Sequence, residues 1–419
     1  LLMSLYFFMV IATFWILKPL KRGLLVNYYQ ESPLQFLGST FSGAEVEQLA
    51  KVLNMVVVYL IVIGFTWLSD RLHRQKLNVV ICSVYALLFI GFGMLMDSIT
   101  PGVTWSFYVL GDMFNSTLVV FFWAFANDIF HSDQAKRTYG IVGLGGIIGG
   151  IVGSSIVVGY VETLGRDTLL YICVIPMILL AGIGYIVNNR VELVSEEQKP
   201  CGGDKKCSSI YEGALLVFKS KYLLAIVGII GLYEMVSNIV DFQLSAIIAS
   251  EIAGDLNKDA YFGFVGQLTS VLSLLVQLFL TSFIMKKYGV RIALLFLPIA
   301  ITLGSVGFLV VPSILFVTMM SVSDNSLNYS INQSAKEALY TPTTQSEKYK
   351  AKAFIDMFVQ RSAKVLAVVL NLTVAAYVGI EHIRWLSIAS LIILAGWIAI
   401  VQFAGKEFRE KASVEEVPL

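Results

Sequence analysis

Several charged residues lie within long apolar stretches of this chain. An ionisable group is energetically unfavourable in such a stretch unless it has a structural or functional role. The densest set lies between Ser330 and Lys364 and includes the cations Lys336, Arg361 and Lys364. A charge at the bilayer centre costs about 2.5–3.5 kcal/mol on insertion scales, so such residues usually face a cavity within the protein. Arg361 and Lys364 are three residues apart, which places them on one face of a helix. Two cations on one face indicate a binding site for an anion.

The same pattern recurs along the chain. Apart from charges at the ends of the apolar stretches, with Lys336 kept because its place is in dispute, the charged residues within them are Lys18, Lys21, Arg22, Asp112, Glu234, Asp241, Asp324, Lys336, Asp356, Arg361 and Lys364. Guanidinium binds two anionic oxygens at once and ammonium acts as a point charge, so this mixture of cations suits phosphate groups. We expect Asp112 and Asp241 each to pair with a lysine while the site is empty, and a polyphosphate to take over those lysines.

Two structural interpretations compete with a binding site. The buried charges can form permanent ion pairs that hold helices together. Lys336 alone can be a lysine near a helix end that extends its ammonium to the membrane surface. The sequence leaves these alternatives open.

The composition indicates an integral membrane protein. Of 419 residues, 57% are hydrophobic and 14% are charged, a balance that is not typical of a water-soluble domain of this size. Cys82 and Cys173 lie in apolar stretches and are expected to behave as small hydrophobic residues. Cys201 and Cys207 flank a polar segment without a nearby histidine, so we expect reduced thiols and no metal site. No cofactor and no nucleic-acid partner are predicted.

Twelve apolar windows of about 20 residues are long enough to span a bilayer. They are Leu1–Val26, Leu49–Ser69, Leu77–Met96, Val103–Phe130, Tyr139–Val161, Leu169–Val187, Tyr222–Ala249, Tyr261–Met285, Ile292–Val311, Ser313–Ala338, Ala353–Gly379 and Ile383–Ala404. The first window is followed by cations and does not resemble a signal peptide. Because the chain begins with Leu, we expect a short leader before it.

A polar linker divides these windows into six and six. The predicted domains are an N-terminal half over residues 1–187, a linker over 188–221, a C-terminal half over 222–404 and a tail over 405–419. The predicted fold class is therefore all-α integral membrane, with twelve transmembrane helices in two six-helix halves, like the major facilitator transporters. Lys and Arg concentrate in the loops after even-numbered windows and in the tail, which predicts that both termini are cytoplasmic.

Two shorter patterns support this arrangement. The loop at Ser69–Lys76 and the loop at Met285–Ile292 occupy matching places in the two halves and resemble the D-R-x-G-R-R/K loop of major facilitators. The glycine-rich segment Gly140–Ser155 follows no strand and precedes no Lys-Ser/Thr, so it favours close helix packing over a phosphate cradle.

An enzyme is not predicted. The three histidines, His73, His131 and His382, lie at helix ends or in loops, and no Ser/His/Asp or metal cluster can be assembled within the apolar windows. His131 with Asp133 could shuttle protons, although such a pair is more often merely solvated.

Several motifs together are similar to those of one transporter family. Lys336-Glu337-x-x-Tyr340-x-Pro342 resembles K-E-x-x-Y-x-P, and the segment from Lys350 to Lys364 resembles K-x-K-A-x-I-D-x(4)-R-x-x-K. Lys21 falls on a lysine near the end of the family's first helix, and Asp112, ahead of FFWAFAND, falls on its fourth-helix acid. The segment Asn238–Asp241 resembles N-x-V-E. The chain thus resembles the non-mitochondrial ATP/ADP translocases of plastids and obligate intracellular bacteria.

This resemblance implies nucleotide transport, with ATP/ADP exchange or related nucleotide uptake by alternating access. The substrate-binding residues that it implies are Lys21, Asp112, Asn238, Asp241, Lys336, Arg361 and Lys364. Both motif acids are Asp where the family tends to have Glu. The alternative is a major facilitator transporter of another phosphorylated or organic anion, with or without a coupled proton. We expect a monomer in a bacterial inner membrane, with a nucleotide and the lipid bilayer as partners.

Overall fold

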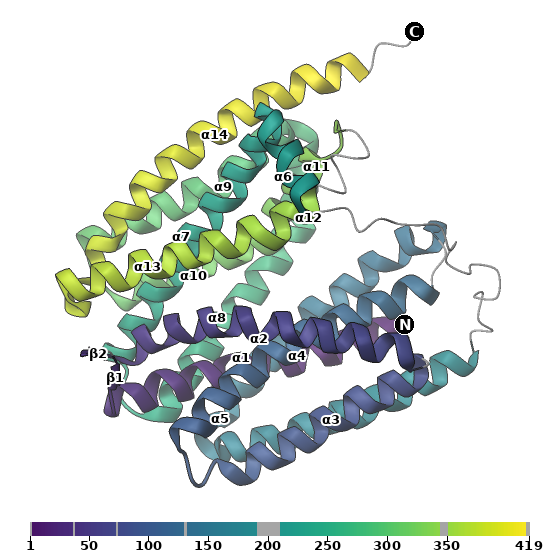
Figure 1. Cartoon of the computed structure of the whole chain (residues 1–419), viewed down its shortest axis with the longest axis vertical. Helices are drawn as coiled ribbons and strands as arrows, with labels where there is room; N and C mark the ends of the chain where they lie inside the picture. The colour runs from purple at the N-terminus through teal and green to yellow at the C-terminus, as the bar shows by residue number, and fades with distance from the viewer. Residues whose placement is uncertain are drawn as a thin grey trace. The chain divides into compact units, whose positions relative to one another are not determined.

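The computed structural model is almost entirely helical (Figure 1). The structure describes residues 2–36, 38–72, 74–129, 132–190, 210–343 and 351–415. The chain divides into two compact units, one of Leu1–Gly202 with Ile252–Val271 and the other of Gly203–Glu251 with Leu272–Leu419. The predictions for Cys201, Cys207, His73, His131 and Lys350 fall outside the described residues, as does most of the predicted linker.

The first unit is a bundle of long helices. Its elements are α1 (Leu2–Glu31), β1 (Leu34–Phe36), β2 (Ser39–Phe41), α2 (Gly43–Arg71), α3 (Arg74–Leu95), α4 (Pro101–Ile129), α5 (Ser132–Arg190) and most of α8 (Asp255–Leu275). α5 combines the fifth and sixth predicted windows, and the chain turns within it at Gly165, whose φ is +81°. A backbone angle of this sign strongly favours glycine, because other residues meet a steric penalty there.

The all-α prediction missed one feature. β1 and β2 pair antiparallel, with Leu34 opposite Phe41 and Phe36 opposite Ser39. Gly38, with φ of +80°, lies in the two-residue connection between them. Two-residue hairpin turns need positive φ, which glycine adopts freely, so a short hairpin forms between α1 and α2.

The glycine-rich segment packs α5 directly against α1, as the sequence predicts. A Cβ added to Gly145, Gly149 or Gly153 would meet the backbone of Ser4, Phe8 or Ala12, respectively. Each of these contacts lies one helical turn after the previous one on both helices, so α1 and α5 run side by side in the same direction. The prediction that the glycines serve close helix packing is confirmed.

The second unit is built around α7. Its elements are α6 (Ile210–Lys219), α7 (Lys221–Glu251), η2 (Val276–Thr281), α9 (Ser282–Val310), α10 (Ile314–Leu327), η3 (Asn328–Asn332), α11 (Gln333–Leu339), α12 (Lys352–Phe354), η5 (Ile355–Val359), α13 (Gln360–Val378), η6 (Ile380–Trp385) and α14 (Leu386–Glu415). α7 packs against α10, α13 and α14. The π-helical segments η3 and η5 interrupt the two predicted windows that carry Lys336 and Arg361. Such π segments occur frequently at functional sites.

Within the described residues, eight helical stretches are long and apolar enough to cross a membrane. Two of them, Tyr139–Val187 and Asp255–Val310, are 49 and 56 residues long, far more than the roughly 20 that one crossing needs. Gly289, which lies in the second predicted loop, has φ of +78° and breaks α9. A multi-pass membrane protein follows, and the number of twelve crossings and the domain boundaries stay predictions.

Candidate functional site

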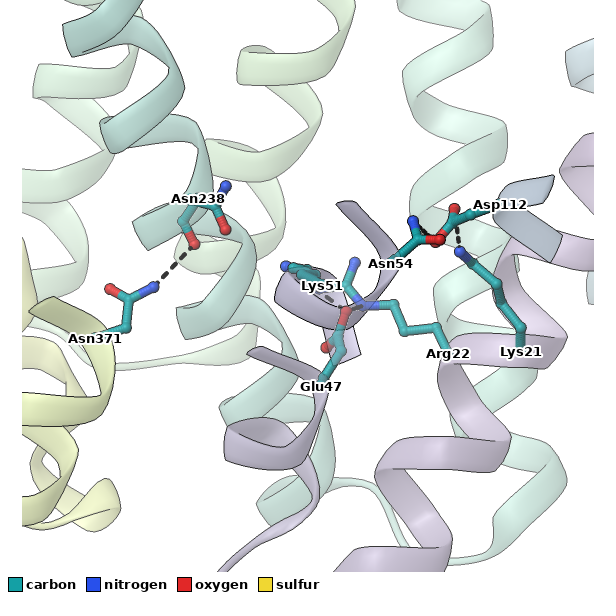
Figure 2. A network of polar contacts seen from close by, with 8 residues as sticks. All are labelled: Lys21, Arg22, Glu47, Lys51, Asn54, Asp112, Asn238 and Asn371. Carbon is teal, nitrogen blue, oxygen red and sulfur yellow. Dashed lines mark hydrogen bonds and ion pairs between the residues drawn. The ribbon is translucent and has the colours of Figure 1, made fainter. Parts of the chain in front are cut away.

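Lys21 and Asp112 form a buried ion pair in the first unit. The side chain of Lys21 is 6% exposed and that of Asp112 is 25% exposed. Asp112 also accepts a hydrogen bond of 2.7 Å from the Asn54 side chain of α2. The ammonium lies 4.3 Å from the centre of the Tyr108 ring. The expected pairing of Asp112 with a lysine is present, and it joins three helices (Figure 2).

Gly111 makes room for this pair. A Cβ at Gly111 would lie 2.6 Å from Cδ of Lys21, so the lysine stem passes directly over the α4 backbone beside Asp112. Any residue larger than glycine at position 111 would displace the Lys21 side chain. The middle carbons of that lysine cannot move aside unless the whole side chain changes direction.

For the transport that the sequence resemblance implies, we expect Gly111→Ala to lower uptake several-fold, since forcing a methyl group into a filled site costs about 1–3 kcal/mol. Gly102→Ala on the same helix is the matched control, because its nearest neighbour would be Thr100 Oγ1 at 3.9 Å. The measurement is uptake of labelled substrate by liposomes holding equal amounts of each variant. Equal uptake by the two variants would contradict this role for Gly111.

A second buried pair lies beside the first. Arg22 Nε is 2.8 Å from Glu47 Oε1, with side chains 9% and 2% exposed. Lys51 Nζ lies 3.7 Å from the same oxygen, and the Arg22 guanidinium lies 4.6 Å from the centre of the Phe262 ring. Figure 2 shows Glu47 between the two cations. This closed arrangement fits an ion pair that holds α1 against α2.

A third polar network ties the start of α8 to α1 and to the turn in α5. Arg166 Nε donates to Asp259 Oδ2 at 2.5 Å and Nη2 donates to Oδ1 at 3.1 Å. Lys258 Nζ donates to Asn27 Oδ1 at 2.7 Å, and Asn27 in turn donates to Asp255. Arg166 and Asp259 are 7% and 0% exposed. The bidentate geometry and deep burial indicate a structural contact.

In the second unit, Lys336 extends inward from the end of its helix. Its Nζ donates to Asn328 Oδ1 at 3.3 Å, two helical turns earlier in the chain, and lies 4.8 Å from the centre of the Tyr233 ring of α7. A lysine that reached the membrane surface would extend the other way, beyond Leu339. The geometry therefore favours an interior role over the surface-reaching alternative.

Arg361 and Lys364 lie on α13, one turn apart. Lys364 Nζ is 3.4 Å from Glu234 Oε2 on α7, with side chains 39% and 13% exposed. Arg361 is half-buried, and no ion pair or hydrogen bond joins its guanidinium to another described residue. Glu234 also acts electrostatically on Lys336. The two predicted cations Lys336 and Lys364 thus share one acidic neighbour.

Asn238 and Asp241 complete the predicted set on α7. Asn238 is 9% exposed, and its side-chain Oδ1 is buried with no hydrogen-bond partner among the described residues. Its backbone carbonyl accepts a hydrogen bond of 3.4 Å from Asn371 of α13 (Figure 2). Asp241 is half-buried and makes an electrostatic contact with Tyr329. Both residues therefore lie on the helix to which Lys364 is paired.

Sequence reasoning missed two partners of the predicted residues. Asn54 is neutral and so carries no charge to mark it within an apolar window. Glu47 lies just before the predicted window Leu49–Ser69 and so falls outside it, although α2 begins at Gly43. The capping box formed by Ser42 and Glu45 marks that earlier start and was readable in the sequence.

Comparison with known families decides the class of this protein. The family model described as TLC ATP/ADP transporter matches residues 102–408. The chain belongs to this family. Its resemblance to the ATP/ADP translocases, drawn from the motifs around Lys21, Asp112, Asp241 and Lys336, is thereby confirmed.

Relatives of this TLC-family chain are named ADP,ATP carrier proteins. ADP,ATP carrier protein 1 of Chlamydia pneumoniae is 23% identical, with 99% of this chain and 92% of the relative covered. ADP,ATP carrier protein 3 of Rickettsia felis is 22% identical, covering 97% and 94%. The chloroplastic ADP,ATP carrier protein 1 of Arabidopsis thaliana is 21% identical, covering 99% and 74%.

Solved structures relate this TLC-family member to other transporters by fold. The nucleoside transporter NupG has a TM-score of 0.67 at 12% identity, with 95% of this chain and 99% of NupG covered. The POT family transporter PepTSo has a TM-score of 0.66 at 12% identity, with 98% of each chain covered. At this identity the likeness concerns the fold alone, which is that of the major facilitators.

Proposed function

We propose that this protein carries nucleotides across a membrane and exchanges ATP for ADP. The observation that carries this proposal is the match of residues 102–408 to the TLC ATP/ADP transporter family. The named carriers in bacteria and plastids support it. Buried cations in both units add the chemistry that a polyphosphate requires.

The cations Lys21, Lys336, Arg361 and Lys364 are proposed to receive the phosphates. Asp112 is paired with Lys21, and Glu234 is paired with Lys364. Pairing lowers the cost of keeping an ammonium out of water until a phosphate replaces the carboxylate. Arg361, which has no acidic partner among the described residues, is available to bind two phosphate oxygens at once. Asn238 and Asp241 are proposed to complete the site from α7.

The proposed architecture has twelve crossings in two halves, over residues 1–187 and 222–404, that alternate about the substrate. The breaks at Gly165 and Gly289 support two crossings in each of the long helical stretches that contain them. The distribution of Lys and Arg supports cytoplasmic termini, and the bacterial relatives support an inner membrane. A monomer suffices for this mechanism.

Transport into liposomes tests the proposal. Purified protein in vesicles preloaded with ADP should accumulate labelled ATP, and vesicles without internal nucleotide should accumulate much less, because exchange requires a counter-substrate. Unlabelled ADP outside should compete, and a sugar phosphate should not. Accumulation of labelled sugar phosphate with no uptake of ATP would instead favour the alternative transporter of another phosphorylated anion.

A further inference from the structure

Asp324 lies on α10, and a negatively charged carboxylate is not suited to binding phosphate. It is 1% exposed, and its Oδ2 accepts a hydrogen bond of 2.6 Å from the Ser237 hydroxyl of α7. Its Oδ1 is also buried and has no hydrogen-bond donor among the described residues. A buried ionised carboxylate requires a cation or several donors, and one hydroxyl does not meet that requirement.

The spacing of residues on α7 places two further acids next to this carboxyl group. Glu234, Ser237 and Asp241 are three and four residues apart, so they share one face of the helix. Ser237 contacts Asp324, and the two acids therefore flank that contact at about 4.5 Å and about 6 Å along the axis. Both act electrostatically on Asp324. A further carboxylate charge close to two other acids is disfavoured.

Among the described residues, the nearby cations do not pair with Asp324. Lys364 is engaged with Glu234 at 3.4 Å. Lys336 donates to Asn328 and acts on Asp324 only from a distance beyond the ion-pair range. α9, which packs against α10, has no titratable side chain between residues 292 and 310.

Apart from Lys336 of α11, the described titratable residues that interact electrostatically with Asp324 are acidic or phenolic. They are Tyr233, Glu234 and Asp241 of α7 and Tyr329 of η3. A proton on Oδ1 removes the unpaired charge without any other change in this environment.

We propose that Asp324 binds a proton on Oδ1 and that this proton is bound together with the nucleotide. The proton comes from water on one side of the membrane and returns to water on the other, and no other bond changes. The inference rests on the proposed function, because phosphates that take over Lys336 and Lys364 would leave the three carboxyl groups with fewer cations nearby. Nucleotide binding then strengthens proton binding at Asp324, and by linkage a proton strengthens nucleotide binding.

The test is the affinity of the purified full-length protein for ATP between about pH 5.5 and about pH 8.5, a range that avoids ordinary Asp and Lys titrations. Wild-type affinity should weaken as pH rises, by up to about tenfold per pH unit for one linked proton. Asp324→Asn, which imitates the protonated acid and keeps an acceptor for Ser237, should hold the low-pH affinity across the range. ATP itself titrates equally for every variant, so the difference between variants reports on Asp324.

Matched variants keep the test decisive. Glu381→Gln removes an exposed acid of the same unit and should behave like wild type. Ser237→Ala removes the hydrogen bond that favours the ionised form of Asp324, so the proton should be held to a higher pH. The ATP affinity of this variant should therefore begin to weaken only at a higher pH than in wild type. This comparison remains available even if Asp324→Asn does not fold. Calorimetry in buffers of different ionisation enthalpy should show more proton uptake on ATP binding in wild type than in Asp324→Asn.

Two results would overturn the inference, and they are distinguishable. If wild type and Asp324→Asn bind ATP with the same pH profile and the same proton uptake, Asp324 is not a linked proton site and nucleotide transport still stands. If wild-type protein binds no ATP or ADP at any pH, the proposed function is wrong and this inference is lost with it.

Discussion

Replacing Lys336 by alanine is expected to reduce ATP/ADP exchange to background while leaving the protein folded. The ammonium lies in the interior of the second unit, against Asn328 and Tyr233, and forms no ion pair with a described acid that its loss would leave unpaired. The variant removes one charge-assisted phosphate contact worth about 1.5–3 kcal/mol. That energy corresponds to about a ten- to hundredfold loss of affinity. The measurement is exchange in ADP-loaded liposomes, beside the thermal unfolding midpoint.

The control for this variant is Lys406→Ala. The Lys406 side chain is 78% exposed and lies 4.0 Å from Glu410 one turn away, in a pair of the kind that contributes little. It should exchange nucleotide like wild type. Exchange at the wild-type rate by Lys336→Ala would remove Lys336 from the proposed site, and a fall in its unfolding midpoint would instead assign it a structural role.

Glu47→Gln is expected to give the largest loss of stability. It removes the carboxylate charge that pairs with the Arg22 guanidinium, whose side chain is 9% exposed. Removing one member of a buried ion pair costs about 3–5 kcal/mol, because the remaining charge stays out of water. The thermal unfolding midpoint in detergent should therefore fall clearly, whereas Glu410→Gln, in the exposed pair with Lys406, should leave it unchanged.

The double variant Arg22→Met with Glu47→Leu separates charge from packing. It removes both charges and keeps apolar volume, so most of the lost stability should return. If Arg22 and Glu47 serve only to hold α1 against α2, the folded double variant should still exchange nucleotide. Recovery of stability without recovery of exchange would place Arg22 in the substrate path, contrary to the structural role argued above.

The sequence was sufficient for the membrane class, for the close packing of the α5 glycines and for the family resemblance, which depend on local composition and spacing. The apolar windows predicted a membrane protein, because a span needs a continuous apolar stretch of fixed length. The glycines of α5 predicted close packing, because residues three and four apart share a helix face. The motif residues Lys21, Asp112 and Lys336 were named from type and spacing alone, and the family match confirmed the resemblance they carried.

Contacts between helices were decided only by the tertiary structure. Asn54 reaches Asp112 across 58 positions of sequence, and Ser237 reaches Asp324 across 87. No local pattern encodes such a pair, because it depends on the rotation and depth at which two helices pack. The same packing leaves Oδ1 of Asp324 without a donor among the described residues and turns Lys336 inward. The positions of charged residues and the periodicity of apolar residues can be read directly from the sequence. The partner of each charge depends on which helix faces pack together in the folded protein.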